Sequence, residues 1–306
     1  MLMMHQRPLR FLLIFLLVFL AGDRLLSRAL EGLVTNSEFR YSRLYRGAAM
    51  ADVLILGDSR GVHSFFAPRL EQDTCMSVFN LSFNGMPIRG SECLLLDYLE
   101  RHPVPKLIVL EVTSVQASSS SIDGLRPYLA HSDRLRALYA SLFPKSSYGV
   151  RVSNLYQFNC EMFFRVCYYL HRSDQSWIMT SRINDELVAQ SESEVTCISL
   201  DSPEWIENLA ALTRISVIAR ERNIRLQLVI APYLPSYRRN IQNWPMVVQA
   251  LSQSVAGRSI SDYSLALTNT GQFADRMHLN DKGAEAFGAI LKRDHFFELN
   301  QDFPHK

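Results

Sequence analysis

The stretch Asp52-Val53-Leu54-Ile55-Leu56-Gly57-Asp58-Ser59-Arg60 decides the fold class. Its first part is a short, continuous apolar run that ends in glycine, which is typical of a strand buried on both faces of a parallel sheet. Its second part places Ser59 directly after that strand, where a helical pattern begins. Because the active sites of open parallel sheets lie beyond the carboxyl ends of the strands, we expect Ser59 to lie where chemistry takes place.

The same alternation of apolar runs and helical patterns continues along the chain. Further strands are predicted at residues 77–81, 106–112, 225–230 and 259–263. Helices are predicted at residues 61–71, 90–100, 154–171, 203–222, 237–256 and 281–292. Such alternation predicts an α/β fold, a three-layer α/β/α sandwich with a central parallel sheet and right-handed crossovers. Regularity lapses at about residues 117–201, which predicts a helical insertion.

Length and composition exclude several classes of protein. A chain of 306 residues that is 48% hydrophobic and 20% charged can bury a core, so wholesale disorder is excluded. Lys and Arg number 32 against 30 Asp and Glu, so the chain lacks the basic surplus that is usual in nucleic-acid-binding proteins. The five cysteines show no CxxC spacing, which argues against a zinc ribbon or a dithiol redox motif.

The amino-terminal segment predicts a membrane location. Arg7 and Arg10 precede an apolar run over residues 11–21. That length fits the apolar part of a signal peptide, about 7 to 15 residues, better than a full span of about 20. No small-residue cleavage site follows, so we favour an uncleaved signal anchor over a cleaved signal peptide. The predicted organisation is an anchor at 1–30, a connector at 31–50 and the α/β domain at 51–300, outside the cytoplasm on the periplasmic side of a single-pass anchor.

A second polar cluster near the carboxyl terminus supplies the base that a serine nucleophile needs. In Asp275-Arg276-Met277-His278 the carboxylate can reach one imidazole nitrogen and leave the other for Ser59. The spacing predicts a catalytic triad of Ser59 as nucleophile, His278 as general base and Asp275 as orienting group, with no metal and no cofactor. The simpler interpretation is that Asp58 and Ser59 only cap a helix.

Together these residues resemble the SGNH (GDSL-type) hydrolase superfamily. The resemblance rests on Gly57-Asp58-Ser59 after a buried strand, Gly85 after the second strand and Asp275-x-x-His278 before the last helix, and it covers roughly residues 52–291. The string FADRMHLNDKGA at residues 273–284 is similar to a membrane-anchored branch of that superfamily. That branch includes proteins similar to those that O-acylate bacterial surface polymers, such as the alginate acetylation and teichoic-acid D-alanylation proteins.

The resemblance implies that the backbone N–H groups of Ser59 and Gly85 form the oxyanion hole. The superfamily usually adds an Asn from a Gly-x-Asn-Asp motif after the third strand, but this chain has EVTSVQ at residues 111–116. The candidates for the third donor are Thr113, Ser114 and Gln116, together with Asn84 beside Gly85.

Three further polar residues stand near the predicted site. Arg60 follows the nucleophile and is a candidate for binding an anionic group on an acceptor, with a solvated helix-start arginine as the alternative. We expect Glu111 to pair with a nearby basic group. His63, four residues after Ser59, is expected to be an ordinary surface residue.

The resemblance implies a membrane-anchored serine esterase or O-acyltransferase that acts on acyl esters, above all acetyl esters, of an envelope or exported polysaccharide. Its expected partners are the membrane, the acylated carbohydrate and a multi-spanning membrane protein that donates acyl groups, with no nucleic acid. One alternative is a non-catalytic binding or assembly component of a polysaccharide-modification complex. The other is a secreted GDSL-type lipase or esterase.

Overall fold

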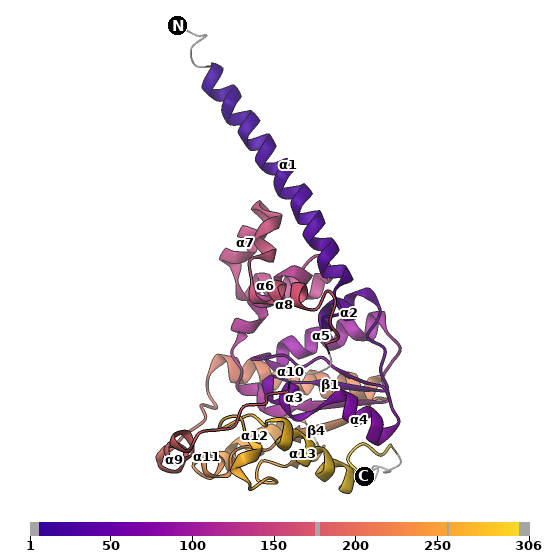
Figure 1. Ribbon diagram of the computed structural model, residues 1–306, viewed down its shortest axis with the longest axis vertical. Helices are drawn as coiled ribbons and strands as arrows, with labels where there is room; N and C mark the ends of the chain where they lie inside the picture. The colour runs from indigo at the N-terminus through magenta and orange to yellow at the C-terminus, as the bar shows by residue number, and fades with distance from the viewer. Residues whose placement is uncertain (1–5, 175–177, 256, 300–306) are drawn as a thin grey trace. The chain divides into compact units, whose positions relative to one another are not determined.

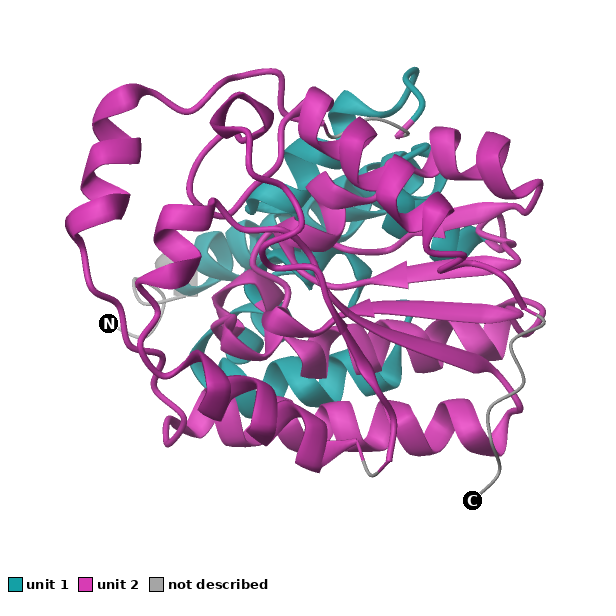
Figure 2. Ribbon diagram, turned by 90° about the horizontal axis from the view of Figure 1, so that it is seen from below, with its two compact units in different colours: residues 1–46, 123–173 teal, residues 47–122, 174–306 magenta. Residues whose placement is uncertain are grey.

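The structure, a computed structural model, describes residues 6–174, 178–255 and 257–299, with side chains described from residue 9 onward. It divides into two compact units (Figure 2). Unit 1 comprises residues 1–46 and 123–173, and unit 2 comprises residues 47–122 and 174–306. The three residues of the predicted triad all belong to unit 2.

Unit 2 is built around a five-stranded sheet with the strand order β2-β1-β3-β4-β5. The strands are β1 Val53–Leu56, β2 Val78–Asn80, β3 Leu107–Glu111, β4 Arg225–Ile230 and β5 Ile260–Asp262. All four neighbouring pairs run parallel. The predicted α/β class and the central parallel sheet are therefore confirmed, and each strand falls within the run that predicted it.

The central strands are buried on both faces, as their continuous apolar sequences indicate. Every residue of β1 and of β3 is buried. Val53 and Ile55 join an apolar core that includes Phe65 and Phe287. Because successive side chains of a strand point to opposite faces, the residues between them face the other layer. The edge strand β5 is short and partly exposed, so its polar sequence fits its position.

Helices cover both faces of this sheet (Figure 1). The helices α5 Ile88–Arg101 and α10 Pro203–Glu221 pack against each other on one face, and α13 Asp281–Arg293 packs against α4 Ala67–Thr74 on the other. The strand order explains this division. The connection from β1 to β2 and the one from β2 to β3 run in opposite directions across the sheet, so right-handed crossovers place their helices on opposite faces.

Two of the predicted helices of unit 2 are each divided in two. Residues 61–71 fall into α3 Ser59–Ser64 and α4, because the two residues between them take an extended backbone ahead of the proline in the first turn of α4. Residues 237–256 fall into α11 Pro235–Arg239 and α12 Trp244–Ser254, which also has proline in its first turn. The remaining elements of unit 2 are η1 Val112–Gln116, α9 Asp185–Ser193 and η4 Thr270–Gln272.

Unit 1 is helical among its described residues. Its elements are α1 Gln6–Asn36, α2 Arg40–Arg46, α6 Asp133–Leu142, α7 Pro144–Val152, η3 Asn154–Phe158 and α8 Glu161–Tyr168, and η2 Ser119–Tyr128 runs across the boundary between the units. Buried aromatic rings form its interior. The ring of Tyr41 lies 5.4 Å from that of Phe39 and 5.9 Å from that of Tyr128. Residues 117–201, predicted as one insertion, thus contribute to both units.

The prediction of a membrane helix within residues 1–30 is not supported. Among the described residues, none of the helices is both long enough and apolar enough to cross a membrane. The apolar run ends at Asp23, which is only 3% exposed and caps η3. Its carboxylate accepts hydrogen bonds from the Ser153 hydroxyl at 2.5 Å and from the Asn154 N–H at 2.9 Å. Residues 1–5 of the predicted anchor lie outside the described residues.

Candidate active site

Ser59, His278 and Asp275 meet in unit 2. The Ser59 Oγ lies 2.7 Å from the His278 Nε2, and the His278 Nδ1 lies 2.7 Å from the Asp275 Oδ2. An ionised carboxylate can only accept hydrogen bonds, so the Nδ1 carries the imidazole proton and the Nε2 lone pair faces the serine hydroxyl. The structure therefore brings together the three residues that the sequence predicted would meet, in the order that proton transfer from Ser59 requires.

The turn after β1 places the nucleophile. Gly57 has φ +149°, and a Cβ at this position would lie 2.9 Å from the Cβ of Glu111, so the turn needs glycine. Asp58 caps α3 by accepting the Arg60 N–H at 2.9 Å, as the simpler interpretation of this pair expected. Burial and then the Glu111 carboxylate raise the pKa of Asp58 to about 7. The glycine turn and the Asp58 cap together fix Ser59 as the first residue of α3.

A tight loop presents the base. The Ala274 N–H donates to the His278 carbonyl at 2.9 Å, and Phe273 forms an antiparallel bridge with Leu279. The Asp275 Oδ1 accepts the His278 N–H at 3.0 Å, which leaves Oδ2 for the imidazole. Burial alone would raise the pKa of Asp275, but its hydrogen bonds, first among them that from His278, hold the pKa below its ordinary value. The carboxylate is therefore ionised at neutral pH.

The prediction that Arg60 binds an anionic group on an acceptor is wrong, and so is the alternative of a solvated arginine. Its side chain is 1% exposed. The guanidinium donates to the Met277 carbonyl at 2.9 Å and also to the Ala231 carbonyl, and it lies 3.4 Å from the ring centroid of Tyr233. Arg60 thus connects the nucleophile helix to the end of β4 and to the loop that carries His278.

Glu111 is the buried counterion of Arg60, so its predicted pairing with a basic group is confirmed. Its carboxylate lies 3.3 Å from the Arg60 Nε and is 0% exposed. The Thr113 hydroxyl donates to it at 2.7 Å, and the Ala231 N–H donates at 3.3 Å. A buried charge is tolerated only when it is paired and hydrogen-bonded, and these contacts meet that need.

Of the predicted oxyanion donors, Ser59 begins α3 after β1, whereas Gly85 and Asn84 lie on the exposed turn after β2. Gly85 has φ +68°, and the Ser121 hydroxyl donates to its carbonyl at 2.6 Å, which fixes the turn. Within the described part of the chain, the backbone N–H groups of Ser59 and Gly85 make no hydrogen bond and can donate to a ligand. Ser121 was not among the predicted site residues. The serine run from 118 to 121 was the only sign of it in the sequence.

The candidates for the third oxyanion donor are narrowed by elimination. The Thr113 hydroxyl is committed to the Glu111 carboxylate, and the Ser114 hydroxyl donates to the Glu111 carbonyl at 2.7 Å. Asn84 and Gln116 are both exposed, and neither side chain has a hydrogen-bond partner among the described residues. Asn84 adjoins Gly85 in the same turn, which makes it the better placed of the two.

His63 is not the surface residue that was expected. It is 6% exposed, and its ring meets that of His278 edge to face, with the centroids 5.5 Å apart at 82°. This contact places the His63 ring beside that of His278. The signal in the sequence was the four-residue spacing from Ser59, which puts both side chains on one helix face.

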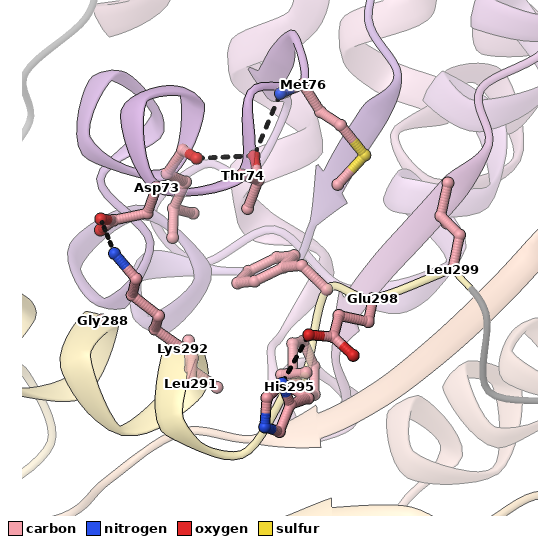
Figure 3. Close-up of a pocket in the computed structure, with 12 residues that line it drawn as sticks. Asp73, Thr74, Met76, Gly288, Leu291, Lys292, His295, Glu298 and Leu299 are labelled. Carbon is pink, nitrogen blue, oxygen red and sulfur yellow. Dashed lines mark hydrogen bonds and ion pairs between the residues drawn. The ribbon is translucent and has the colours of Figure 1, made fainter.

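Unit 2 also contains a cavity that lies apart from the triad. This cavity of about 460 Å³ lies between the carboxyl-terminal ends of α4 and α13 (Figure 3). An ion pair between Lys292 and Asp73 at 2.9 Å and a hydrogen bond between His295 and Glu298 at 2.5 Å border it, and no triad residue lines it. Within the described residues, no group of three or more His, Cys, Asp or Glu side chains is arranged to hold a metal ion.

Comparisons with known proteins do not assign this chain to a family. No family model matches it, and no curated protein matches it. A solved structure described as "a putative platelet activating factor from Streptococcus pneumonia" is similar over 94% of this chain and 99% of its own, with 13% sequence identity and a TM-score of 0.42. A likeness at this level identifies neither a family nor an activity.

Proposed function

We propose that the protein is a serine esterase or O-acyltransferase whose catalytic residues are Ser59, His278 and Asp275. The observation that carries the proposal is the chain of two 2.7 Å contacts from the Ser59 hydroxyl through the His278 ring to the Asp275 carboxylate. A serine that only capped a helix would not need an imidazole oriented by a carboxylate.

The proposed reaction has two halves. The Ser59 Oγ attacks the ester carbonyl while His278 takes the hydroxyl proton, and the N–H groups of Ser59 and Gly85 donate to the oxyanion. The tetrahedral intermediate collapses, His278 returns the proton to the departing alcohol, and an acyl-serine remains. Water or a second hydroxyl, deprotonated by His278, then attacks the acyl-serine, and its proton finally restores the Ser59 hydroxyl.

The proposed substrate is an acyl ester, in particular an acetyl ester, of an envelope or exported polysaccharide. The support is the resemblance of residues 273–284 to the polymer-acylating branch of the SGNH superfamily. The proposal extends to a location at a membrane outside the cytoplasm and to a multi-spanning acyl-donor partner. The apolar run over residues 11–21, whose side chains from residue 11 to residue 20 are exposed, supports the membrane location.

A non-catalytic role is the second candidate, because the chain lacks the strand-three Asn of the superfamily and commits Thr113 and Ser114 to Glu111. Hydrolysis of 4-nitrophenyl acetate by the full chain separates the two. We expect turnover in the wild-type protein and only the uncatalysed rate in Ser59→Ala and His278→Ala. A Ser64→Ala control changes a buried serine of the same helix and should retain the activity.

Transfer is distinguished from hydrolysis by adding a soluble oligosaccharide to the same assay and measuring its mass. An acetylated oligosaccharide that appears only with Ser59 present identifies the acyltransferase. Acetate alone identifies the esterase. Equal rates for the wild-type protein and Ser59→Ala would exclude both and leave the binding role.

A further inference from the structure

Unit 1 contains a cavity of about 350 Å³ that the proposed function does not use. Residues of α1, of α6 and α7, of η3 and of the segment between η2 and α6 line it, and all of them belong to unit 1. Its polar lining includes Arg28 and Arg151, together with Arg136, Asn154 and Gln157.

The charges in this lining favour an anionic ligand. Arg28 and Arg151 are exposed, and among the described residues neither has an ion pair or a hydrogen-bond partner for its side chain. Arg136 is different, because it donates to the Leu129 carbonyl at 3.0 Å and to Asp133 at 2.7 Å. The acid in the lining, Glu31, is already paired with His131 at 2.7 Å. The charges that the fold leaves open here are therefore positive.

A largely buried glutamine adds uncharged donor and acceptor groups to the lining. Gln157 lines the cavity and is only 8% exposed, yet no hydrogen bond of its side chain is found in the described part of the chain. The side chain of Asn154 is likewise without a partner there, since only its backbone N–H is used, by Asp23. The amide atoms of Gln157 are not among the fully buried polar atoms of the described residues that lack a partner, so they are accessible from the cavity that the residue lines. Two amides beside two unpaired guanidinium groups favour a ligand rich in oxygen.

We propose that this cavity binds a phosphate ester. Guanidinium groups form paired, charge-assisted hydrogen bonds with phosphate oxygens, and the amides of Gln157 and Asn154 supply further donors. The phosphate can belong to a lipid headgroup or to a soluble molecule. The structure favours the lipid, because the exposed apolar side chains of α1 include Leu25 and Leu26, which precede Arg28 by less than one helical turn. An amphiphile would find apolar and cationic surface on one element.

Binding of the full chain to vesicles tests the site. The probes are vesicles of phosphatidylcholine alone and vesicles of equal parts phosphatidylcholine and phosphatidylglycerol. Each basic residue near an anionic surface contributes about 1 kcal/mol, so Arg28→Gln with Arg151→Gln should weaken binding to the anionic vesicles about thirty-fold. Binding to phosphatidylcholine should not change. The control double variant, Arg165→Gln with Arg172→Gln, removes two charges of unit 1 outside this lining and should bind like the wild type.

Two further arms identify what is bound and where. Gln157→Leu keeps every charge but removes the amide from the lining, and it should weaken binding several-fold. If this variant binds normally, or if the control double variant loses as much as the test variant, surface charge rather than the cavity is responsible and the proposal is overturned.

Calorimetry with glycerol 3-phosphate completes the test. Binding in solution that requires Arg28 and Arg151 supports a soluble phosphate ester, whereas binding confined to vesicles supports the lipid. If the loss of Arg28 and Arg151 changes binding in none of these experiments, the proposed site is overturned.

Discussion

The guanidinium of Arg60 donates to the carbonyl of Met277 across 2.9 Å, although the two residues are 217 positions apart in the chain. Arg60 follows Ser59, the proposed nucleophile, and Met277 precedes His278, the proposed base. This contact, with the bond from Arg60 to the Ala231 carbonyl, ties the nucleophile helix to the base loop. We therefore expect Arg60 to act as a positioning residue for the proposed triad.

The substitution Arg60→Lys tests this positioning role. Lysine keeps the charge opposite Glu111 but lacks the planar fork that holds two carbonyls at once. We expect kcat to fall about 10²-fold, because a displacement of 1 Å at the reacting atoms costs about that much, while KM changes little. Arg126→Lys is the matched control, since Arg126 is also buried and donates to backbone carbonyls, but in unit 1. A fall in kcat that is equal in both variants would assign the effect to general destabilisation.

The Asp275→Asn variant tests the orienting carboxylate. An amide would present its NH₂ or its oxygen to the His278 Nδ1 and favour the wrong imidazole tautomer, so kcat should fall about 10⁴-fold with the fold intact. Steady-state kinetics and thermal unfolding of the same samples measure both effects. Asp281→Asn, an exposed carboxylate at the start of α13, is the control and should keep its activity. A modest loss in Asp275→Asn would mean that His278 does not depend on this contact.

Asn84 is the expected third oxyanion donor. Removal of one such donor typically costs about 10² to 10³ in kcat, so Asn84→Ala should lose activity to that extent. The side chain is exposed and without a partner in the described residues, so the free energy of unfolding should change by less than about 0.5 kcal/mol. Gln116→Ala is the paired comparison. A loss in Gln116→Ala with full activity in Asn84→Ala would transfer the role to Gln116.

The pKa of Asp58 predicts a pH dependence of stability. Burial and the Glu111 carboxylate raise it from the ordinary value of 3.8 to about 7. Between those values the folded protein retains a proton that the unfolded chain has lost, so the free energy of unfolding falls as the pH rises through this window. Asp58→Asn keeps the cap on the Arg60 N–H and does not titrate. Denaturant titrations should therefore show a steeper fall from pH 4 to pH 7 in the wild type than in this variant. A shallower fall in the wild type would contradict the raised pKa.

The strands and the triad were predictable from sequence because local patterns specify both. A continuous apolar run ending in glycine, such as residues 53–57, has few places in a fold other than the middle of a parallel sheet. Ser59 follows such a strand, and the motif Asp275-x-x-His278 before the last helix supplied the base that a serine needs. Ser59 and His278 could thus be placed together across 219 positions with no knowledge of the loops between them.

The surroundings of the triad were not predictable, because their partners are distant in sequence and not marked by any local pattern. Arg60 has the sequence context of a surface arginine, and only its counterion 51 positions away and its carbonyl partners explain its burial. Asp23 likewise interrupts an apolar run and has the appearance of its polar end, but its partner Ser153 lies 130 positions further on. His63 is different, because its four-residue spacing from Ser59 was a local signal for a position beside the triad.

Reaction with a fluorophosphonate, followed by peptide mapping, tests the central claim most directly, since only an activated serine attacks such a probe. We predict a single adduct on Ser59 in the full chain, formed much more slowly in His278→Ala and absent from Ser59→Ala. An adduct on another serine, or labelling of Ser59→Ala at the wild-type rate, would show that the contact between the serine hydroxyl and the imidazole does not make a nucleophile.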